Sequence, residues 1–185
     1  MRALPLALAV VIMLAGCASV SREECLAGDW VSIGQRDGAA GRVGSAQFER
    51  HVTACAKVDV TPDRAAWAQG YEAGLQRYCT PLSGLREGEA GSSYRNVCPA
   101  GTEAGFLRGH DLGLAAYRQR QRISEIEREI STLTQRNAML ASDEENRAAW
   151  LANRSEILSL RLDLGLARAE LSRIEREIRA FRAAQ

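Results

Sequence analysis

The sequence predicts an all-α protein, in which a small disulfide-linked helical domain is followed by a long antiparallel helical hairpin, a coiled coil. Three observations support this fold class. Glycine and cysteine gather between residues 25 and 117, aromatic residues are only 5% of the chain, and residues 118–185 contain no proline and a single glycine. The expected parts are a signal peptide at 1–16, a lipidated linker at 17–24, a domain at 25–102 and a helical hairpin at 103–184.

The N-terminal segment has the features of a bacterial export signal. Arg2 precedes an apolar stretch that is much shorter than the roughly 20 residues of a membrane-spanning helix. The stretch ends in Leu14-Ala15-Gly16-Cys17, which resembles the lipoprotein signal, where small residues precede a cysteine that is acylated. By this resemblance Cys17 is the lipidation site, and Ala18 and Ser19 after it favour the outer membrane, with the body facing the periplasm. The alternative is an ordinary secretory signal with an incidental cysteine.

The other cysteines are predicted to form disulfide bonds. Cys25, Cys55, Cys79 and Cys98 are even in number, and export would place them in an oxidising compartment. Their spacing contains no Cys-x-x-Cys pair, which argues against a zinc site, so we expect no metal and no other cofactor. Of the three possible pairings we favour Cys25–Cys55 with Cys79–Cys98, because each pair closes a separate glycine-rich excursion. Loop-closure entropy gives each bridge roughly 3 kcal/mol.

Capping signals place the first helices of the domain. Asp29 precedes Trp30 and Ile33, which are apolar and one helical turn apart, so Asp29 is a plausible N-cap. Ser45 is expected to cap a second helix. Phe48, Val52 and Cys55 would then lie along one face of that helix and point to the core.

Further signals divide the second half of the domain. Thr61-Pro62-Asp63 combines a capping hydroxyl, a proline in the first turn and an acid at the positive end of a helix. The helix that follows should run to about Tyr78. The glycine-rich stretch at 80–91 is expected to be a loop, without the lysine and hydroxyl of a phosphate-binding loop. A long helix should begin near Thr102.

A glycine pattern recurs within the domain. Residues 67–78 and 106–117 share an aromatic residue, glycine, an acid, glycine, leucine and tyrosine in step, and a looser copy begins at Trp30. A glycine in a helix interior costs about 1 kcal/mol relative to alanine, which is tolerable where two backbones approach closely. We therefore expect the two helices to contact each other through these glycines, with chance similarity as the alternative. The contact glycines would be Gly70, Gly74, Gly109 and Gly113.

The same block resembles a family of uncharacterised proteobacterial lipoproteins that share a domain of unknown function. The resemblance covers about residues 25–115, excludes the C-terminal helices and implies no assigned chemistry. The residues that carry it are Gly28-Asp29-Trp30, Gly34, Asp37-Gly38, Gly41, Pro62-Asp63, Tyr78-Cys79-Thr80-Pro81, Gly84, Gly88, Gly91, Tyr94 and Val97-Cys98-Pro99.

The sequence assigns no catalytic residue. General acid–base catalysis needs two titratable groups held near one substrate atom, and no pattern shows such a convergence. Asp29 and Asp63 are interpreted as helix caps, and His51, which follows Glu49-Arg50, as part of a solvated helix face. The second hypothesis is a periplasmic ligand-binding or hydrolytic domain. The residues expected near its cleft are Asp37, His110 and Asp111.

Two heptad runs predict the C-terminal hairpin. Apolar residues recur in steps of three and four over 123–140 and again over 157–181. The polar break between the runs contains Ser142 and Glu145, which have the spacing of a capping box. Folding the chain there gives a hairpin; the alternative is a continuous rod that dimerises. The pairs set opposite each other include Leu133 with Ile157 and Asn137 with Asn153.

We expect a non-catalytic function. The protein would be an outer-membrane lipoprotein, held in the lipid through acylated Cys17, whose helical arm binds another envelope protein or the cell wall. A formal net charge of +1 gives no argument for a nucleic-acid partner. A concave pocket with converging carboxylates would favour the enzyme, and an exposed apolar stripe would favour the binding module.

Overall fold

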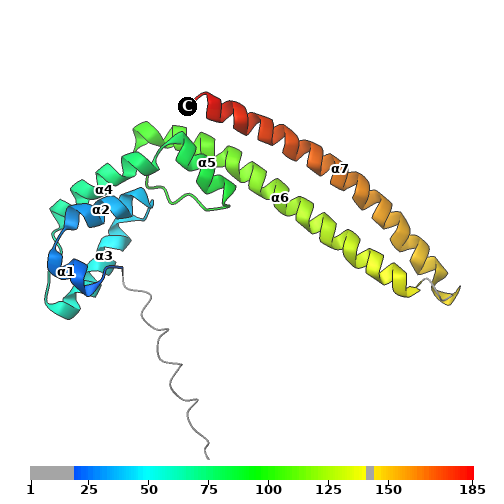
Figure 1. Ribbon diagram of the computed structural model, residues 1–185, viewed down its shortest axis with the longest axis horizontal. Helices are drawn as coiled ribbons and strands as arrows, with labels where there is room; N and C mark the ends of the chain where they lie inside the picture. The colour runs from blue at the N-terminus through cyan, green and yellow to red at the C-terminus, as the bar shows by residue number, and fades with distance from the viewer. Residues whose placement is uncertain (1–18, 141–143) are drawn as a thin grey trace, which may run out of the picture. The chain divides into compact units, whose positions relative to one another are not determined.

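The computed structural model describes residues 19–140 and 144–185 (Figure 1). Over these ranges the regular structure is helical and contains no strand, which confirms the predicted all-α fold. The expected signal peptide, the lipidation site Cys17 and the capping residue Ser142 lie outside the described residues. None of the described helices is both long enough and apolar enough to cross a membrane.

The chain divides into two compact units. Unit 1 comprises Met1–Tyr78 and Arg95–Val97, and unit 2 comprises Cys79–Tyr94 and Cys98–Gln185. This division differs from the expected boundary at residue 102, because the second half of the glycine-rich block packs with the hairpin.

Unit 1 begins earlier than the sequence suggested. Val20 is 4% exposed and packs with Cys25 in the core, and helix α1 (Arg22–Ala27) follows directly. Ser21 and Glu24 form a capping box at its start. The expected linker at 17–24 is therefore part of the fold from Ser19 onward.

Three helices complete unit 1: α2 (Trp30–Ala39), α3 (Gly44–Cys55) and α4 (Arg64–Tyr78), with the 3₁₀ segment η1 (Ala56–Val58) after α3. Asp29 caps α2 by accepting from the Ser32 amide at 3.1 Å, as predicted. Ser45 does not cap α3. The helix begins at Gly44, two residues earlier than a Ser45 cap would place it, with Val43 at the N-cap and no side-chain hydrogen bond. Its buried face includes Phe48 and Cys55, as expected, and His51, whereas Val52 is 36% exposed and lies at the edge of that face.

Helices α2 and α4 run parallel and touch through glycine (Figure 1). A Cβ atom at Gly34 or Gly38 would overlap the carbonyl oxygen of Trp67 or Tyr71 on α4. The contact is reciprocal, because the two glycines of α4 face backbone carbonyls of α2. Such close backbone approach suits Cα–H···O contacts between helices. The glycines of this α2–α4 glycine contact are Gly34, Gly38, Gly70 and Gly74.

Unit 2 repeats this arrangement with α5 (Pro81–Glu89) and α6 (Ala100–Leu140). The stretch expected to be a loop is thus a helix, with Thr80 capping the Ser83 amide at 3.2 Å and proline in the first turn. Each glycine row finds its partner inside its own unit, so the expected pairing of 67–78 with 106–117 is wrong. The glycines of the α5–α6 glycine contact are Gly84, Gly88, Gly109 and Gly113.

The predicted hairpin is formed by α6 and α7 (Arg147–Ala183), which lie side by side in Figure 1, with the 3₁₀ segment η2 (Glu144–Asn146) before α7. Gln119 donates to the carbonyl of Ala167 at 2.9 Å, a bond between residues 48 apart that the antiparallel packing of α6 and α7 permits. Asn137 and Asn153, which were expected to lie opposite each other as a polar pair, show no hydrogen bond between their side chains. Asn137 donates instead to the carbonyl of Trp150 at 3.3 Å, and its own Oδ1 has no partner among the described residues.

Candidate functional site

A buried carboxylate, that of Asp37, is the centre of a polar cluster in unit 1. His51 Nε2 donates to Asp37 Oδ2 at 2.7 Å, and Trp67 Nε1 donates to the same oxygen at 3.0 Å. Gln47 Nε2 donates to Oδ1 at 3.3 Å. On the other side of the imidazole, Ser19 Oγ lies 2.8 Å from His51 Nδ1. We call these five residues the Asp37 cluster.

The fold brings the cluster together from four segments. Asp37 lies on α2 next to the α2–α4 glycine contact, which holds Trp67 of α4 within reach. Gln47 and His51 are one turn apart on α3, so both side chains face the carboxylate. A carboxylate only accepts, so Nε2 carries the proton and, in a neutral imidazole, Nδ1 accepts from the hydroxyl of Ser19.

Ser19, His51 and Asp37 are the residue types of a hydrolytic triad, but their geometry is that of a structural clamp. In the Ser-His-Asp triad the nucleophile bonds to Nε2 and the carboxylate to Nδ1, whereas here the two nitrogens are exchanged. His51 is 0% exposed and Asp37 is 1% exposed, so the imidazole presents no surface to a substrate. The cluster satisfies the hydrogen bonding of buried polar groups and holds Ser19 against the domain.

The structure gives the remaining candidate acids and bases separate surroundings. His51 is buried, which corrects its interpretation as a solvated residue. His110 is also buried, in unit 2, where its Nε2 donates to the carbonyl of Ser92 at 2.7 Å and its ring stacks on Phe106. The side chain of Asp111 is 78% exposed. Asp37 belongs to unit 1, whereas His110 and Asp111 belong to unit 2, and the cleft expected near these three residues stays a prediction.

A hollow of about 350 Å³ opens on unit 1 beside the cluster. Arg42 lies 3.6 Å from Asp37, and Arg95 donates to the carbonyl of Gly41 at 3.4 Å. The lining is basic and its arginines are exposed. The lining residues are Arg42, Val43, Ala46, Gln47, Arg50 and Arg95. No group of three or more His, Cys, Asp or Glu side chains suited to a metal ion occurs in the described part of the chain.

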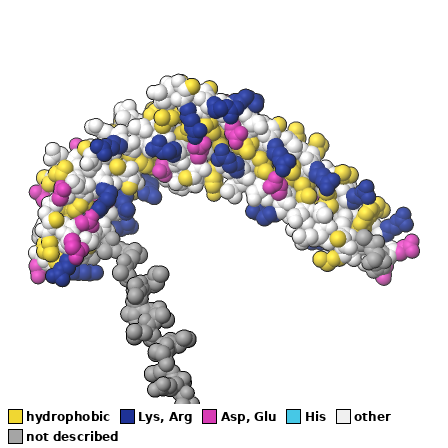
Figure 2. All heavy atoms as spheres, in the orientation of Figure 1, with side chains coloured by type: hydrophobic (Ala, Val, Ile, Leu, Met, Phe, Trp, Pro, Cys, Tyr) yellow, Lys and Arg dark blue, Asp and Glu magenta, His cyan; other side chains and the backbone are white. Residues whose placement is uncertain are grey.

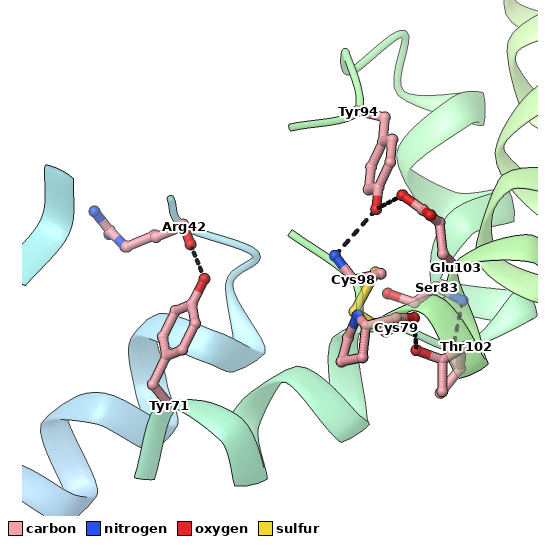
Figure 3. The surroundings of a disulfide bond; sticks show 10 residues. Arg42, Tyr71, Cys79, Ser83, Tyr94, Cys98, Thr102 and Glu103 are labelled. Carbon is pink, nitrogen blue, oxygen red and sulfur yellow. Dashed lines mark hydrogen bonds between the residues drawn. A yellow bond between two sulfur atoms is a disulfide. The ribbon is translucent and has the colours of Figure 1, made fainter. Parts of the chain in front are cut away.

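Both disulfides have the expected connectivity. Cys25 bonds to Cys55 within unit 1 and Cys79 bonds to Cys98 within unit 2, with Cα atoms 5.5 Å apart in each bridge. Tyr94 ties the second bridge to α6 (Figure 3). Its hydroxyl accepts from the Cys98 amide at 3.0 Å and donates to Glu103 at 2.9 Å. Burial raises the pKa of Tyr94, which favours the protonated form that makes this donation.

The second candidate site is a row of exposed leucines on α7. Leu151, Leu158, Leu162 and Leu166 are 53%, 59%, 67% and 63% exposed. They lie on the side of α7 opposite the buried residues that face α6, among them Ile157. Figure 2 shows hydrophobic side chains along the arm, interspersed with basic ones. We call the four leucines the leucine stripe.

The sequence interpretation missed both of these sites for identifiable reasons. The signal for His51 was available, because it lies four residues after Gln47 and three after Phe48, on the apolar side of α3. The signal for the leucine stripe was a second set of apolar residues in α7, outside the heptad run assigned to the hairpin. The contact between Ser19 and His51 had no signal, since it joins residues 32 apart.

Comparison with known proteins identifies one family. The model of a family described as a protein of unknown function, DUF2799, matches residues 29–123. The match runs from the N-cap of α2 into α6 and so includes both glycine contacts. No curated protein and no solved structure shows significant similarity to the chain.

Proposed function

The chain belongs to the DUF2799 family of proteins of unknown function, and from that premise we propose that it is a non-catalytic binding module of the bacterial cell envelope. The module is a lipoprotein anchored in the outer membrane through Cys17, faces the periplasm, and binds another protein through its helical arm.

The anchor rests on the lipoprotein-like signal and on the start of the fold. Ala18 is the only residue between Cys17 and Ser19, which is already bonded to His51. One residue spans at most about 3.6 Å, so an acylated Cys17 would hold unit 1 at the membrane surface without a flexible tether.

The observation that carries the binding function is the leucine stripe. Its four side chains are more than half exposed and lie in one row on a helix whose opposite face is already packed. A row of exposed leucines on a helix whose other face is packed is the kind of apolar surface that a protein partner binds. The matching face of α6 is polar between residues 118 and 138, so the stripe is specific to α7.

The hydrolytic alternative has weaker support. It needs a base and an acid that converge on open space, as in a general acid–base site. Asp37 and His110 are buried, each with its own hydrogen-bond partners, and Asp111 is exposed. The binding module is therefore the function that the contacts favour.

Photo-crosslinking in living cells tests the proposal. A photoreactive residue at Leu158 should yield a covalent protein adduct in the outer-membrane fraction, while the same residue at Ser131, exposed on α6, should not. Leu158→Asn with Leu162→Asn should abolish an adduct formed from position 151 without unfolding the hairpin, because these side chains are exposed.

The Cys17→Ser variant is the control for the anchor and should leave the outer-membrane fraction. An absence of any adduct at position 158, with the protein itself present in the outer membrane, would contradict the binding function. Normal processing and membrane retention of Cys17→Ser would contradict the anchor.

A further inference from the structure

The hollow beside the Asp37 cluster carries more positive charge than the neighbouring acids neutralise. Three arginines line it, Arg42, Arg50 and Arg95. Of these, Arg42 alone forms an ion pair with a described acid, Asp37, at 3.6 Å. The other two guanidinium charges therefore have no carboxylate partner among the described residues. The volume of about 350 Å³ is in the range of pockets that hold small molecules, roughly 300–1,000 Å³.

The arginines are held in place while keeping free N–H groups. Arg42 approaches Asp37 through Nε, and Arg95 donates to the carbonyl of Gly41 through Nη1. Each therefore keeps further N–H groups that have no acceptor among the described residues. Arg50 forms no hydrogen bond or ion pair with the described part of the chain. Guanidinium groups suit oxyanions, because their N–H groups form a planar fork that matches two oxygens at once.

One wall of the hollow is the N-terminus of α3. Its N-cap residue, Val43, and Ala46 in its first turn both line the hollow. No described side chain caps this end, and the amides of Ser45 and Ala46 donate to no described residue. The positive end of the helix dipole therefore adds to the charge of the arginines. Tyr71 fixes this wall, because its hydroxyl donates to the carbonyl of Arg42 at 2.5 Å (Figure 3).

Gln47 adds a hydrogen-bond acceptor to this basic surface. Its side chain is 2% exposed and borders the hollow. The carboxylate of Asp37 only accepts, so the contact of 3.3 Å assigns Nε2 to the side of Asp37 and leaves Oε1 on the other. Oε1 accepts from no described residue, and the hollow is the open space beside it. A ligand that completes the site therefore carries a donor as well as an anionic group.

We propose that the hollow binds a phosphate monoester that also carries a hydroxyl or ammonium group. The phosphate lies among the three arginines at the start of α3, and the donor of the ligand reaches Gln47 Oε1. A phosphate monoester carries about −1.5 to −2 charges at pH 7 and three terminal oxygens, which suits two unneutralised arginines better than a carboxylate does. Asp37 is then a positioning residue, because its carboxylate contacts both Arg42 and Gln47.

Calorimetric titration of the full chain tests the class of ligand. The Cys17→Ser variant is used, so that no acyl chain is attached. Glycerol 3-phosphate should bind about tenfold more tightly than glycerate, in which a carboxylate replaces the phosphate, since charge-assisted hydrogen bonds to the arginines are lost. It should also bind more tightly than methyl phosphate, which has no hydroxyl group.

Three results would contradict parts of the site. Equal affinity for glycerate would overturn the phosphate, and equal affinity for methyl phosphate would overturn the donor assigned to Gln47. No binding of any of the three compounds would overturn the site as a whole.

Single arginine variants test whether the hollow is the place of binding. Arg50→Gln and Arg95→Gln should each weaken the binding of glycerol 3-phosphate about tenfold. Arg77→Gln is the matched control, because Arg77 is also exposed, forms no ion pair with a described residue and does not line the hollow. Arg50→Gln should leave the melting temperature unchanged, since Arg50 has no described partner. Equal weakening in all three variants would show attraction by net charge and overturn the site.

A soluble phosphate ester and a lipid headgroup offer the same chemistry, and vesicle flotation of the Cys17→Ser variant separates them. For a lipid headgroup, the protein should float with phosphatidylcholine vesicles that contain lysophosphatidic acid, which presents a phosphate monoester beside a free hydroxyl. It should not float with phosphatidylcholine alone, and Arg50→Gln should abolish flotation. Binding in the calorimeter without flotation assigns the site to a soluble ester. Flotation that persists in Arg50→Gln would overturn the placement of the headgroup in the hollow.

The leucine stripe has no part in this site, so the two can be tested separately. Loss of the crosslink at position 158 would contradict the binding function of the arm and leave the phosphate site standing. Failure of every phosphate ester to bind would do the reverse.

Discussion

Units 1 and 2 each contain a pair of parallel helices joined through glycines, α2 with α4 and α5 with α6. The two pairs differ in the segment that connects the first helix to the second. The first helix of each pair carries the same pattern: Gly34-Gln-Arg-Asp-Gly38 in α2 and Gly84-Leu-Arg-Glu-Gly88 in α5. Helix α3 lies between α2 and α4, whereas α5 and α6 are joined by the irregular segment 90–99, of which Arg95–Val97 belong to unit 1. The glycine contacts thus define a common scaffold on which the connection differs.

The segment that connects the two helices of each pair determines whether the acidic residue of the pattern, Asp37 or Glu87, is buried. In unit 1, α3 covers Asp37 and supplies Gln47 and His51 to bond it. In unit 2 the equivalent acid, Glu87, is only half-buried, and the connecting segment instead supplies the carbonyl of Ser92 to His110. The comparison teaches that backbone contacts position the helices, while the connecting segment determines which polar groups are buried and must be satisfied.

Removing the two equivalent acids should have very different effects. Asp37→Asn breaks a buried charged network and should destabilise unit 1 by about 3–5 kcal/mol, because the remaining donors stay buried without a charged acceptor. Glu87→Gln should change stability by about 0.5 kcal/mol or less. Urea unfolding followed by the fluorescence of Trp67, which contacts Asp37, measures the first variant.

Far-ultraviolet circular dichroism should monitor Glu87→Gln, since its unit also holds the hairpin. Equal decreases in the free energy of unfolding of the two variants would mean that Glu87 has the same structural role as Asp37. That result would contradict the difference between the units.

Removing either disulfide should have nearly the same effect. The bridges join residues 30 and 19 positions apart, for which loop closure gives roughly 3–4 kcal/mol each, slightly more for the longer loop. Thermal unfolding of Cys25→Ala/Cys55→Ala and Cys79→Ala/Cys98→Ala measures the two contributions. Alkylation of the denatured, unreduced wild type should label none of these four cysteines, and a free thiol at any of them would show that the corresponding bridge is not formed.

A methyl group at equivalent contact glycines should destabilise the two units equally. Gly70→Ala and Gly109→Ala each place a Cβ against a carbonyl of the facing helix, an overpacking that typically costs 1–3 kcal/mol. Gly101→Ala is the matched control, since nothing lies within 4 Å of its Cβ position. Melting temperatures should fall for the first two and not for the third; a loss in only one unit would show that the two contacts are not equivalent.

Local chemistry made several elements predictable from the sequence. Asp29 and Asp63 marked the starts of α2 and α4, because capping depends on neighbours within one turn. Helix α4 begins at Arg64, so the predicted positions of Thr61 as the cap and of Pro62 in the first turn were too early. The disulfide pairing followed from the spacing of the cysteines. The hairpin followed from two heptad runs and the polar break between them, which all act over short distances.

Helix α5 shows why the rest was missed. Gly84 and Gly88 lower the intrinsic helix propensity of this stretch, so its local sequence alone predicts a loop. The helix forms because α6 packs against those glycines, a tertiary effect that overrides propensity. The agreement with the pattern of α2 could have identified it. The Asp37 cluster was less accessible, because its members come from segments that only the folded chain brings together.

The glycine contacts also constrain how the protein can change over evolutionary time. Every amino acid other than glycine has a Cβ atom, so any replacement at the eight contact positions introduces an atom where a backbone already lies. The side chains between the glycines do not make the backbone contact, so the contact itself does not fix their identity. A copied helix pair can therefore keep its geometry while its outward residues diverge, one copy acquiring a buried polar cluster and the other a long arm. Because the packing of the pair depends on only eight glycines, a duplicated helix pair can keep its packing while other residues change.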